Sequence, residues 1–266
     1  MYDFNYHKPG SLADAAAAIA GAEDGKLIAG GMTLIATMKQ RLAAPSDLVD
    51  LGGISELSGI SVGGGTVTIG AMTTHGAVAA SADVKGAIPA LAELADNIGD
   101  PQVRNRGTIG GSIANNDPAA DYPAALVALG ATVVTNKRQL AADDFFTGLF
   151  ETALEEDEIV TSIQFPVPEK AAYMKFANPA SRYAMVGVFV AKGPAGVRVA
   201  VTGAGDGGVF RVAEMESALS GSFSADAISG ISVSPDGLNS DIHASAEYRA
   251  HLISVMAKRA VAAAAG

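Results

Sequence analysis

Cysteine is absent from all 266 residues of this sequence. Its absence excludes disulfide bonds, thiolate zinc sites, cysteine nucleophiles and any iron–sulfur cluster held by the chain itself. Histidine is scarce as well: there are four, and none lies beside a second histidine or a carboxylate at the spacing of metal ligands. No Gly-x-Ser-x-Gly elbow or Ser/His/Asp arrangement is visible. We therefore predict no metal site and find no candidate for hydrolytic chemistry.

Positive charge and long apolar runs are also in short supply. The formal net charge is -10 at pH 7, whereas nucleic-acid binding needs a face rich in Lys and Arg, so we predict no nucleic-acid partner. No apolar run approaches the roughly 18 residues that span a bilayer, and the first residues lack the pattern of a secretory signal. We expect no transmembrane segment and a cytoplasmic location. Apolar residues at 49% and charged residues at 17% predict a well-packed chain of one large or two smaller domains.

What the sequence does contain is a pair of glycine-rich turns, Leu27–Leu34 (LIAGGMTL) and Arg104–Asn115 (RNRGTIGGSIAN). We predict that each turn lies where a strand ends. Glycine lets the backbone approach an anion closely, and its N–H groups can point at phosphate oxygens. Neither turn has the Gly-Lys-Ser/Thr of a Walker loop or the three spaced glycines of a Rossmann fingerprint. Either turn alone is equally typical of a plain strand connection, but the pair favours one ligand with two phosphates.

The pattern around the first turn predicts a β-α-β-α-β order, with Thr33 as a helix cap at a strand-to-helix junction. Later segments predict a hairpin, helices on both sides of the second turn, and a chain break at 166–168. Beyond the break, the pattern predicts three strands followed by helices. The expected strands are 2–6, 26–29, 47–51, 60–62, 66–69, 131–135, 159–165, 173–176, 186–192 and 197–202.

A few other side chains are candidates for binding, each with a plainer interpretation. Asp121 could hold ribityl or ribose hydroxyls, or simply cap the helix that begins at Tyr122. Tyr183 could stack on an aromatic ring system, or be an ordinary core or surface tyrosine. Lys175 could bond to a flavin edge, or be a solvated charge on a strand. The acidic run 155–158 is predicted to be a solvated turn.

Together these motifs resemble the FAD-binding medium subunit of molybdenum hydroxylases, the family of aerobic carbon-monoxide dehydrogenase and bacterial xanthine dehydrogenase. The resemblance rests on AGGMTL at 29–34, RNRGTIGGS at 104–112 and DPAAD at 117–121, and it covers nearly the whole chain. It implies an α+β fold with a two-lobed vanillyl-alcohol-oxidase-like FAD-binding domain at 1–168, whose lobes are about 1–54 and 55–168. A small C-terminal domain with a three-stranded antiparallel sheet and helices would occupy 169–266.

The resemblance also implies a non-covalent FAD site. The backbone of both glycine turns would hold the pyrophosphate, and one Asn and one Asp would reach the ribityl chain and neighbouring polar atoms. Two aliphatic residues would lie against the flavin, a lysine near its polar edge, and a tyrosine beside the isoalloxazine. In that order, the implied residues are Ala29, Gly30, Gly31, Met32, Thr33, Leu34, Thr108, Ile109, Gly110, Gly111, Ser112, Asn115, Asp121, Ile159, Val160, Lys175 and Tyr183.

The resemblance also accounts for the absence of cysteine. In the resembled enzymes a small subunit carries iron–sulfur clusters and a large subunit carries molybdopterin and the substrate, so a cysteine-free chain corresponds to the flavin part. The implied role is an oxidoreductase subunit that takes electrons from a cluster and passes them to an external acceptor such as a quinone or NAD. The implied partners are the small iron–sulfur subunit and the large molybdopterin subunit, in a dimer of heterotrimers. No side chain of this chain is expected to be catalytic.

Two positions depart from the family pattern. The first turn often carries Ser where this chain has Thr33, which keeps the hydroxyl, and an Asp often precedes the tyrosine where this chain has Arg182. Two other functions stay open at this point. The chain could be a self-contained flavin oxidoreductase, or a flavin-binding module without turnover.

Overall fold

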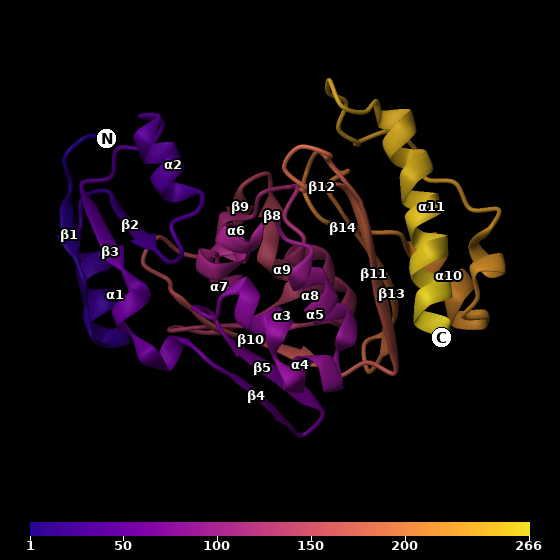
Figure 1. Ribbon diagram of the computed structural model, residues 1–266, viewed down its shortest axis with the longest axis horizontal. Coiled ribbons are helices and arrows are strands. Elements are labelled where there is room, and N and C mark those ends of the chain that lie inside the picture. Colours follow the sequence, from indigo (N-terminus) through magenta and orange to yellow (C-terminus); the bar gives the residue numbers. More distant parts are fainter.

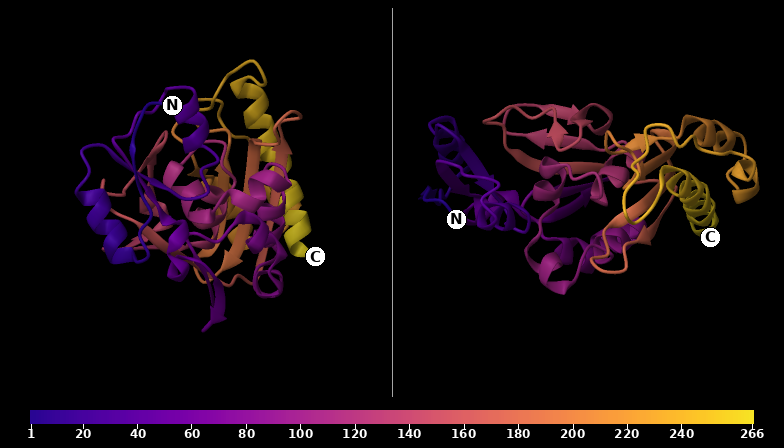
Figure 2. Two further views of the ribbon diagram at one scale, coloured as in Figure 1. Left: turned by 60° about the vertical axis from the view of Figure 1, so that its left-hand side comes forward. Right: turned by 90° about the horizontal axis from the view of Figure 1, so that it is seen from above.

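Three β-sheets follow one another along the long axis of the molecule in chain order, as the computed structural model of residues 1–266 shows (Figure 1). Seen from above, the N-terminal part lies at one end and the C-terminal helices at the other (Figure 2). The chain thus combines helices and sheets, as the sequence predicts. No helix has both the length and the hydrophobicity that a membrane span requires.

The N-terminal sheet has three short parallel strands in the order β1-β3-β2. Ser11 caps its first helix by accepting a hydrogen bond from the N–H of Asp14, which satisfies one of the free donors of the first turn. The predicted β-α-β-α-β order is confirmed. The elements are β1 (Asn5–His7), α1 (Leu12–Ala20), β2 (Gly25–Ile28), α2 (Leu34–Lys39) and β3 (Asp47–Asp50). Two short 3-10 helices follow, η1 (Leu51–Gly53) and η2 (Ser55–Leu57).

The central sheet is antiparallel, with the order β4-β5-β10-β6-β7, and includes the predicted hairpin. Its strands are β4 (Ile60–Gly63), β5 (Thr66–Gly70), β6 (Thr132–Thr135), β7 (Gln139–Ala141) and β10 (Val160–Pro166); a separate hairpin is formed by β8 (Phe146–Gly148) and β9 (Glu151–Thr152). The helices are α3 (His75–Ala80), α4 (Ala82–Ala87), α5 (Pro89–Asp96), α6 (Pro101–Arg106), α7 (Ile109–Asn115), α8 (Tyr122–Leu129) and α9 (Ala142–Phe145).

The C-terminal sheet, defined here as β11–β14, has four antiparallel strands rather than the predicted three. The additional strand has only two residues, too few to show an alternating pattern in the sequence. The elements are β11 (Lys170–Ala177), β12 (Ala184–Gly193), β13 (Gly196–Thr202), β14 (Phe210–Arg211), α10 (Ala213–Gly221), η3 (Ala225–Ile228) and α11 (Ala246–Ala265).

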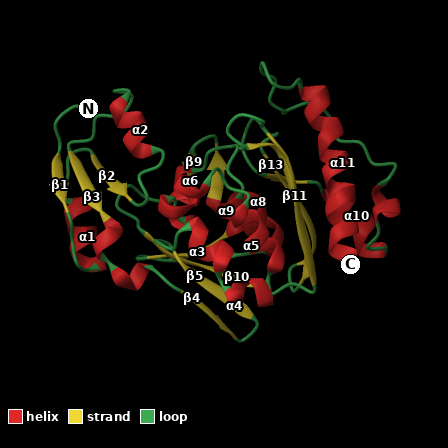
Figure 3. Ribbon diagram, viewed as in Figure 1, coloured by secondary structure: helices red, strands yellow, loops and turns green.

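Helices cover both faces of the C-terminal sheet (Figure 3). On one face, Tyr173, Phe189 and Ala200 belong to the same core as α5 and α8, and α8 is buried along its whole length. On the other face, the alternate residues, such as Val188 and Val199, pack with α10 and α11. The core therefore runs across the predicted boundary at 168, and the division of the chain into two domains stays a prediction.

Candidate functional site

A cavity of about 810 Å³ lies where the two glycine turns meet. This volume is within the range of small-molecule and cofactor sites, about 300–1,000 Å³. Its wall also includes the segment Asp117–Asp121, the residues that lead into β10, and Tyr183. All of the predicted binding residues line this cavity except Ile109, which is fully buried in the central core, and Lys175. Their contact with FAD stays a prediction.

The first turn exposes its backbone donors at the cavity wall. It connects β2 to α2, and Gly31 takes a left-handed conformation with φ +73°. The N–H groups of Ala29–Thr33 make no hydrogen bond within the protein, and Thr33 forms no side-chain cap, contrary to expectation. Buried backbone N–H groups are rarely left unpaired; Ala29, Gly30 and Gly31 are partly buried, whereas Met32 and Thr33 are exposed to solvent. Five consecutive donors at one wall are suited to bind an anionic ligand.

The second turn is built differently from the first. It follows a helix, α6, and forms the first turn of α7, so the prediction that it ends a strand is wrong. The physical reason is that Pro101 favours a helix start, with Asp100 as its cap, directly before this turn. The N–H groups of Ile109, Gly110, Gly111 and Ser112 donate to Thr73 O, Ala71 O, Thr108 Oγ1 and Thr108 O, respectively.

These four N–H groups donate to acceptors within the protein, so they are not available to a pyrophosphate in this structure. The second turn contributes three polar groups to the cavity: the N–H of Thr108, the hydroxyl of Ser112 and the side chain of Asn115. None of them has a hydrogen-bond partner in the protein. The two turns are therefore not equivalent. Anion binding through the backbone falls to the first turn, and the second supplies polar side chains and a packing surface.

The glycines let the two turns approach each other. A Cβ at Gly30 would collide with the backbone of Arg106 and Gly107, and a Cβ at Gly111 would lie 3.4 Å from the Cβ of Ala29. Gly110 faces elsewhere: its Cβ would lie 2.6 Å from the Cβ of Ala71. Gly110 is thus needed to pack α7 against the segment before α3.

Asp121 is a buried carboxylate at the cavity wall and does not cap α8 with its side chain. Its Oδ1 accepts a hydrogen bond from the Tyr173 hydroxyl at 2.5 Å and lies 3.0 Å from Lys175 Nζ. Lys175 also donates to Asn97 O and is buried, so it is neither a solvated charge nor part of the cavity lining. Burial raises the pKa of the Asp121 carboxyl, and the Lys175 ammonium and the Tyr173 hydrogen bond act against this rise.

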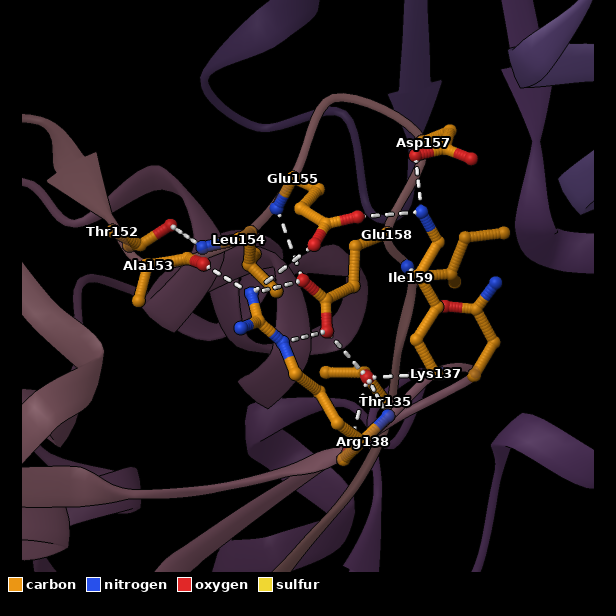
Figure 4. A network of polar contacts seen from close by, with 11 residues as sticks. Thr135, Lys137, Arg138, Thr152, Ala153, Leu154, Glu155, Asp157, Glu158 and Ile159 are labelled. Carbon is orange, nitrogen blue, oxygen red and sulfur yellow. Dashed lines mark hydrogen bonds and ion pairs between the residues drawn. The ribbon is translucent and has the colours of Figure 1, made fainter.

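Glu155 and Glu156 in the acidic run are exposed as predicted, but Glu158 departs from the prediction of a solvated turn. Glu158 is 3% exposed and lines the cavity together with Ile159 and Val160. Figure 4 shows its contacts with Arg138 and Thr135. Arg138 binds it with two hydrogen bonds, of 3.0 and 2.9 Å, and Thr135 donates a third. These contacts lower the pKa of Glu158 from 4.5 to about 2, chiefly because of the Arg138 guanidinium. The partners are 20 and 23 residues away in sequence, so no local pattern indicates this network.

Tyr183 lines the cavity at the end of a loop in which Arg182 has φ +64°. Its hydroxyl accepts a hydrogen bond from Asn178 Nδ2 at 3.1 Å, and its ring meets that of His243 edge to face. This hydrogen bond from Asn178 holds the Tyr183 hydroxyl in place at the end of the loop. Stacking of Tyr183 on a flavin stays a prediction.

His75 is a cavity residue without a predicted binding role. Its ring is 5% exposed, lies 5.4 Å from that of Tyr122 between centroids, and leaves Nδ1 without a hydrogen-bond partner. Burial, assisted by the nearby Arg104, lowers the pKa of His75 from 6.5 to about 4. The imidazole is therefore neutral at pH 7.

Acidification should destabilise the protein through His75. Because the pKa of His75 is lowered in the folded protein, its contribution to the free energy of unfolding is fully present above pH 6.5. This contribution is lost as the pH falls toward 4, since the unfolded chain binds a proton that the folded chain resists. The span from 6.5 to 4 corresponds to roughly 3 kcal/mol of unfolding free energy. Urea unfolding at a series of pH values should show a shallower dependence in His75→Gln than in the wild type. Equal slopes would contradict the assignment.

The cavity and its open backbone donors define the class of the protein as a cofactor-binding domain. Residues 2–168 match the FAD-binding domain of molybdopterin dehydrogenases, and the chain belongs to that family. Its cofactor is FAD. The open donors of the first turn fit such a ligand, because FAD carries a pyrophosphate.

Several known proteins are similar over almost their full length. The nicotine 6-hydroxylase medium subunit of Paenarthrobacter nicotinovorans is 37% identical, over 96% of this chain and 95% of that protein. The carbon monoxide dehydrogenase medium chain of Hydrogenophaga pseudoflava is 36% identical, over 98% and 96%. Among solved structures, reconstituted CO dehydrogenase from Oligotropha carboxidovorans matches with a TM-score of 0.89 at 36% identity, over 98% of this chain and 97% of that one.

Proposed function

We propose that this chain is the FAD-carrying electron-transfer subunit of a multi-subunit molybdenum hydroxylase. The observation that carries the proposal is the row of five unpaired backbone donors, Ala29–Thr33, at the wall of a cofactor-sized cavity. Two relatives support the assignment, the nicotine 6-hydroxylase medium subunit and the carbon monoxide dehydrogenase medium chain. Bound FAD would supply the redox chemistry that relays electrons from an iron–sulfur partner to an external acceptor.

The residues of the chain itself would bind and orient the cofactor. The first turn would hold the pyrophosphate through its N–H groups, and Ser112, Asn115 and Asp121 would provide polar contacts on the opposite turn and wall. Ile159 and Val160 would present an apolar surface to the ring system. The substrate site would lie on a large molybdopterin subunit and the clusters on a small iron–sulfur subunit, in a dimer of heterotrimers.

Titration of the purified chain with FAD tests the proposal. Flavin fluorescence and the visible spectrum should report saturable one-to-one binding of FAD, with weaker binding of FMN and NAD, which lack either the second phosphate or the flavin. Saturation with all three alike, or no binding by the folded chain and by its complex, would contradict it. Bleaching of the flavin by a small substrate without any partner would favour a self-contained oxidoreductase instead.

A further inference from the structure

One wall of the cavity is held by the C-terminal sheet. Gly203 donates its N–H to Pro118 O at 2.8 Å, and the Thr202 hydroxyl donates to Ala120 O at 2.6 Å. Thr202 is 1% exposed and does not line the cavity, whereas Ala120 and Asp121 do. The end of β13 therefore contacts the cavity wall through the backbone of the wall segment, without reaching the cavity.

A second set of contacts fixes the side chain of the same segment. The carboxylate of Asp121 takes its hydrogen bond and its ion pair from Tyr173 and Lys175, both on β11. The segment's own hydrogen bonds, from Ala119 and Ala120 to Asp117, close a local turn but do not involve the Asp121 carboxylate. The orientation of this buried carboxylate consequently depends on the C-terminal sheet.

Strand register explains why these residues meet. Gly187 on β12 pairs with Lys175 on one side and with Thr202 on the other, so the three form one row across the sheet. Tyr173 is two residues from Lys175 and faces the same way. A Cβ at Gly187 would collide with the Tyr173 hydroxyl and lie 2.9 Å from Thr202 Cγ2. The missing side chain leaves the space in which both hydroxyls reach the wall segment.

We infer that Tyr173, Gly187 and Thr202 form a positioning platform that sets the geometry of the Asp117–Asp121 wall and thereby the affinity of the site for FAD. None of the three is a binding residue in the strict sense: Thr202 acts through the backbone of the wall segment, Tyr173 acts through the Asp121 carboxylate, and Gly187 leaves the space that both side chains need. The inference rests on the proposed function, since it takes FAD as the ligand. The C-terminal sheet then determines part of the geometry of the cofactor site.

Thr202→Val tests the platform, because valine keeps the shape of threonine and removes only the hydroxyl. We expect the Kd for FAD to rise by about tenfold or more, which corresponds to about 1.4 kcal/mol. In the FAD-free protein, hydrogen–deuterium exchange should accelerate at the amides of Ala120 and Gly203. The matched control is Ser254→Ala, which removes a hydroxyl that donates to Ile231 O on the far side of the same sheet. The control should change neither quantity.

Tyr173→Phe provides a second variant if Thr202→Val does not fold. It should also raise the Kd for FAD and shift the visible absorption bands of the bound flavin, whereas a merely structural role would lower only the melting temperature. Wild-type affinity and wild-type exchange in a folded Thr202→Val would overturn the platform and leave the proposed function intact. Failure of the wild type to bind FAD would instead overturn the proposed function, and the exchange comparison would still test the platform.

Discussion

Gly30→Ala should weaken FAD binding by about a hundredfold or more, equivalent to about 2.7 kcal/mol. The added Cβ would collide with the carbonyl of Arg106 and approach Gly107, both backbone groups that no side-chain rotation can move. The first turn must then shift away from the second. Because the five unpaired N–H groups belong to consecutive residues, a shift of the turn displaces all of them together. Fluorescence titration with FAD measures the loss.

The matched control for this variant is Gly86→Ala in α4. A Cβ at Gly86 meets nothing within 4 Å, and alanine favours a helix over glycine, so neither affinity nor fold should suffer. Circular dichroism of Gly30→Ala separates a local shift of the turn from general unfolding. If folded Gly30→Ala bound FAD as tightly as the wild type, the first turn would not be the anion site.

Arg138→Met should lower the free energy of unfolding by about 3 kcal/mol, because it leaves the buried carboxylate of Glu158 without its cationic partner. The adjacent Lys137→Met is the matched control. Lys137 pairs with Glu155 and Asp157 at the surface, where ion pairs contribute less than about 1 kcal/mol. Urea unfolding of both variants at pH 7 makes the comparison.

The contacts of Glu158 also predict how the stability of the protein depends on pH in the acid range. Since the folded pKa of Glu158 is about 2 and its ordinary value is 4.5, the stabilisation is present above pH 4.5 and is lost as the pH falls toward 2. Arg138→Met should reduce this part of the pH dependence, whereas Lys137→Met should leave it nearly unchanged. Equal losses of stability in the two variants would show that burial of Glu158 does not matter.

The sequence predicted the fold best where local chemistry decides the structure. Ser11 and the continuous apolar run of β12 act within a few positions, and they correctly indicated a capped helix and a strand. It failed at the second turn, which follows the start of the helix α6 rather than the end of a strand. The two-residue β14 was missed because its pairing with β13 is settled by tertiary packing alone.

The candidate site shows the same limit more sharply. All but two of the residues that the resemblance implies line the cavity, and one of those two, Lys175, pairs with the lining residue Asp121. Glu158 was assigned to a solvated run because its partner Arg138 is distant in sequence. Whether an N–H is free or engaged also depends on the whole fold, as the contrast between the two turns illustrates.

The core that runs across position 168 also bears on how such a chain can evolve. The family match ends at that position, which makes it the obvious junction for a chimera of two relatives. The packing of Tyr173, Phe189 and Ala200 with α5 and α8 describes a larger unit of stability. A graft at this junction would transmit the nucleotide-binding motifs intact while separating them from the sheet against which they fold. Exchange between relatives is therefore constrained by the faces of β11–β13, not by the motifs alone.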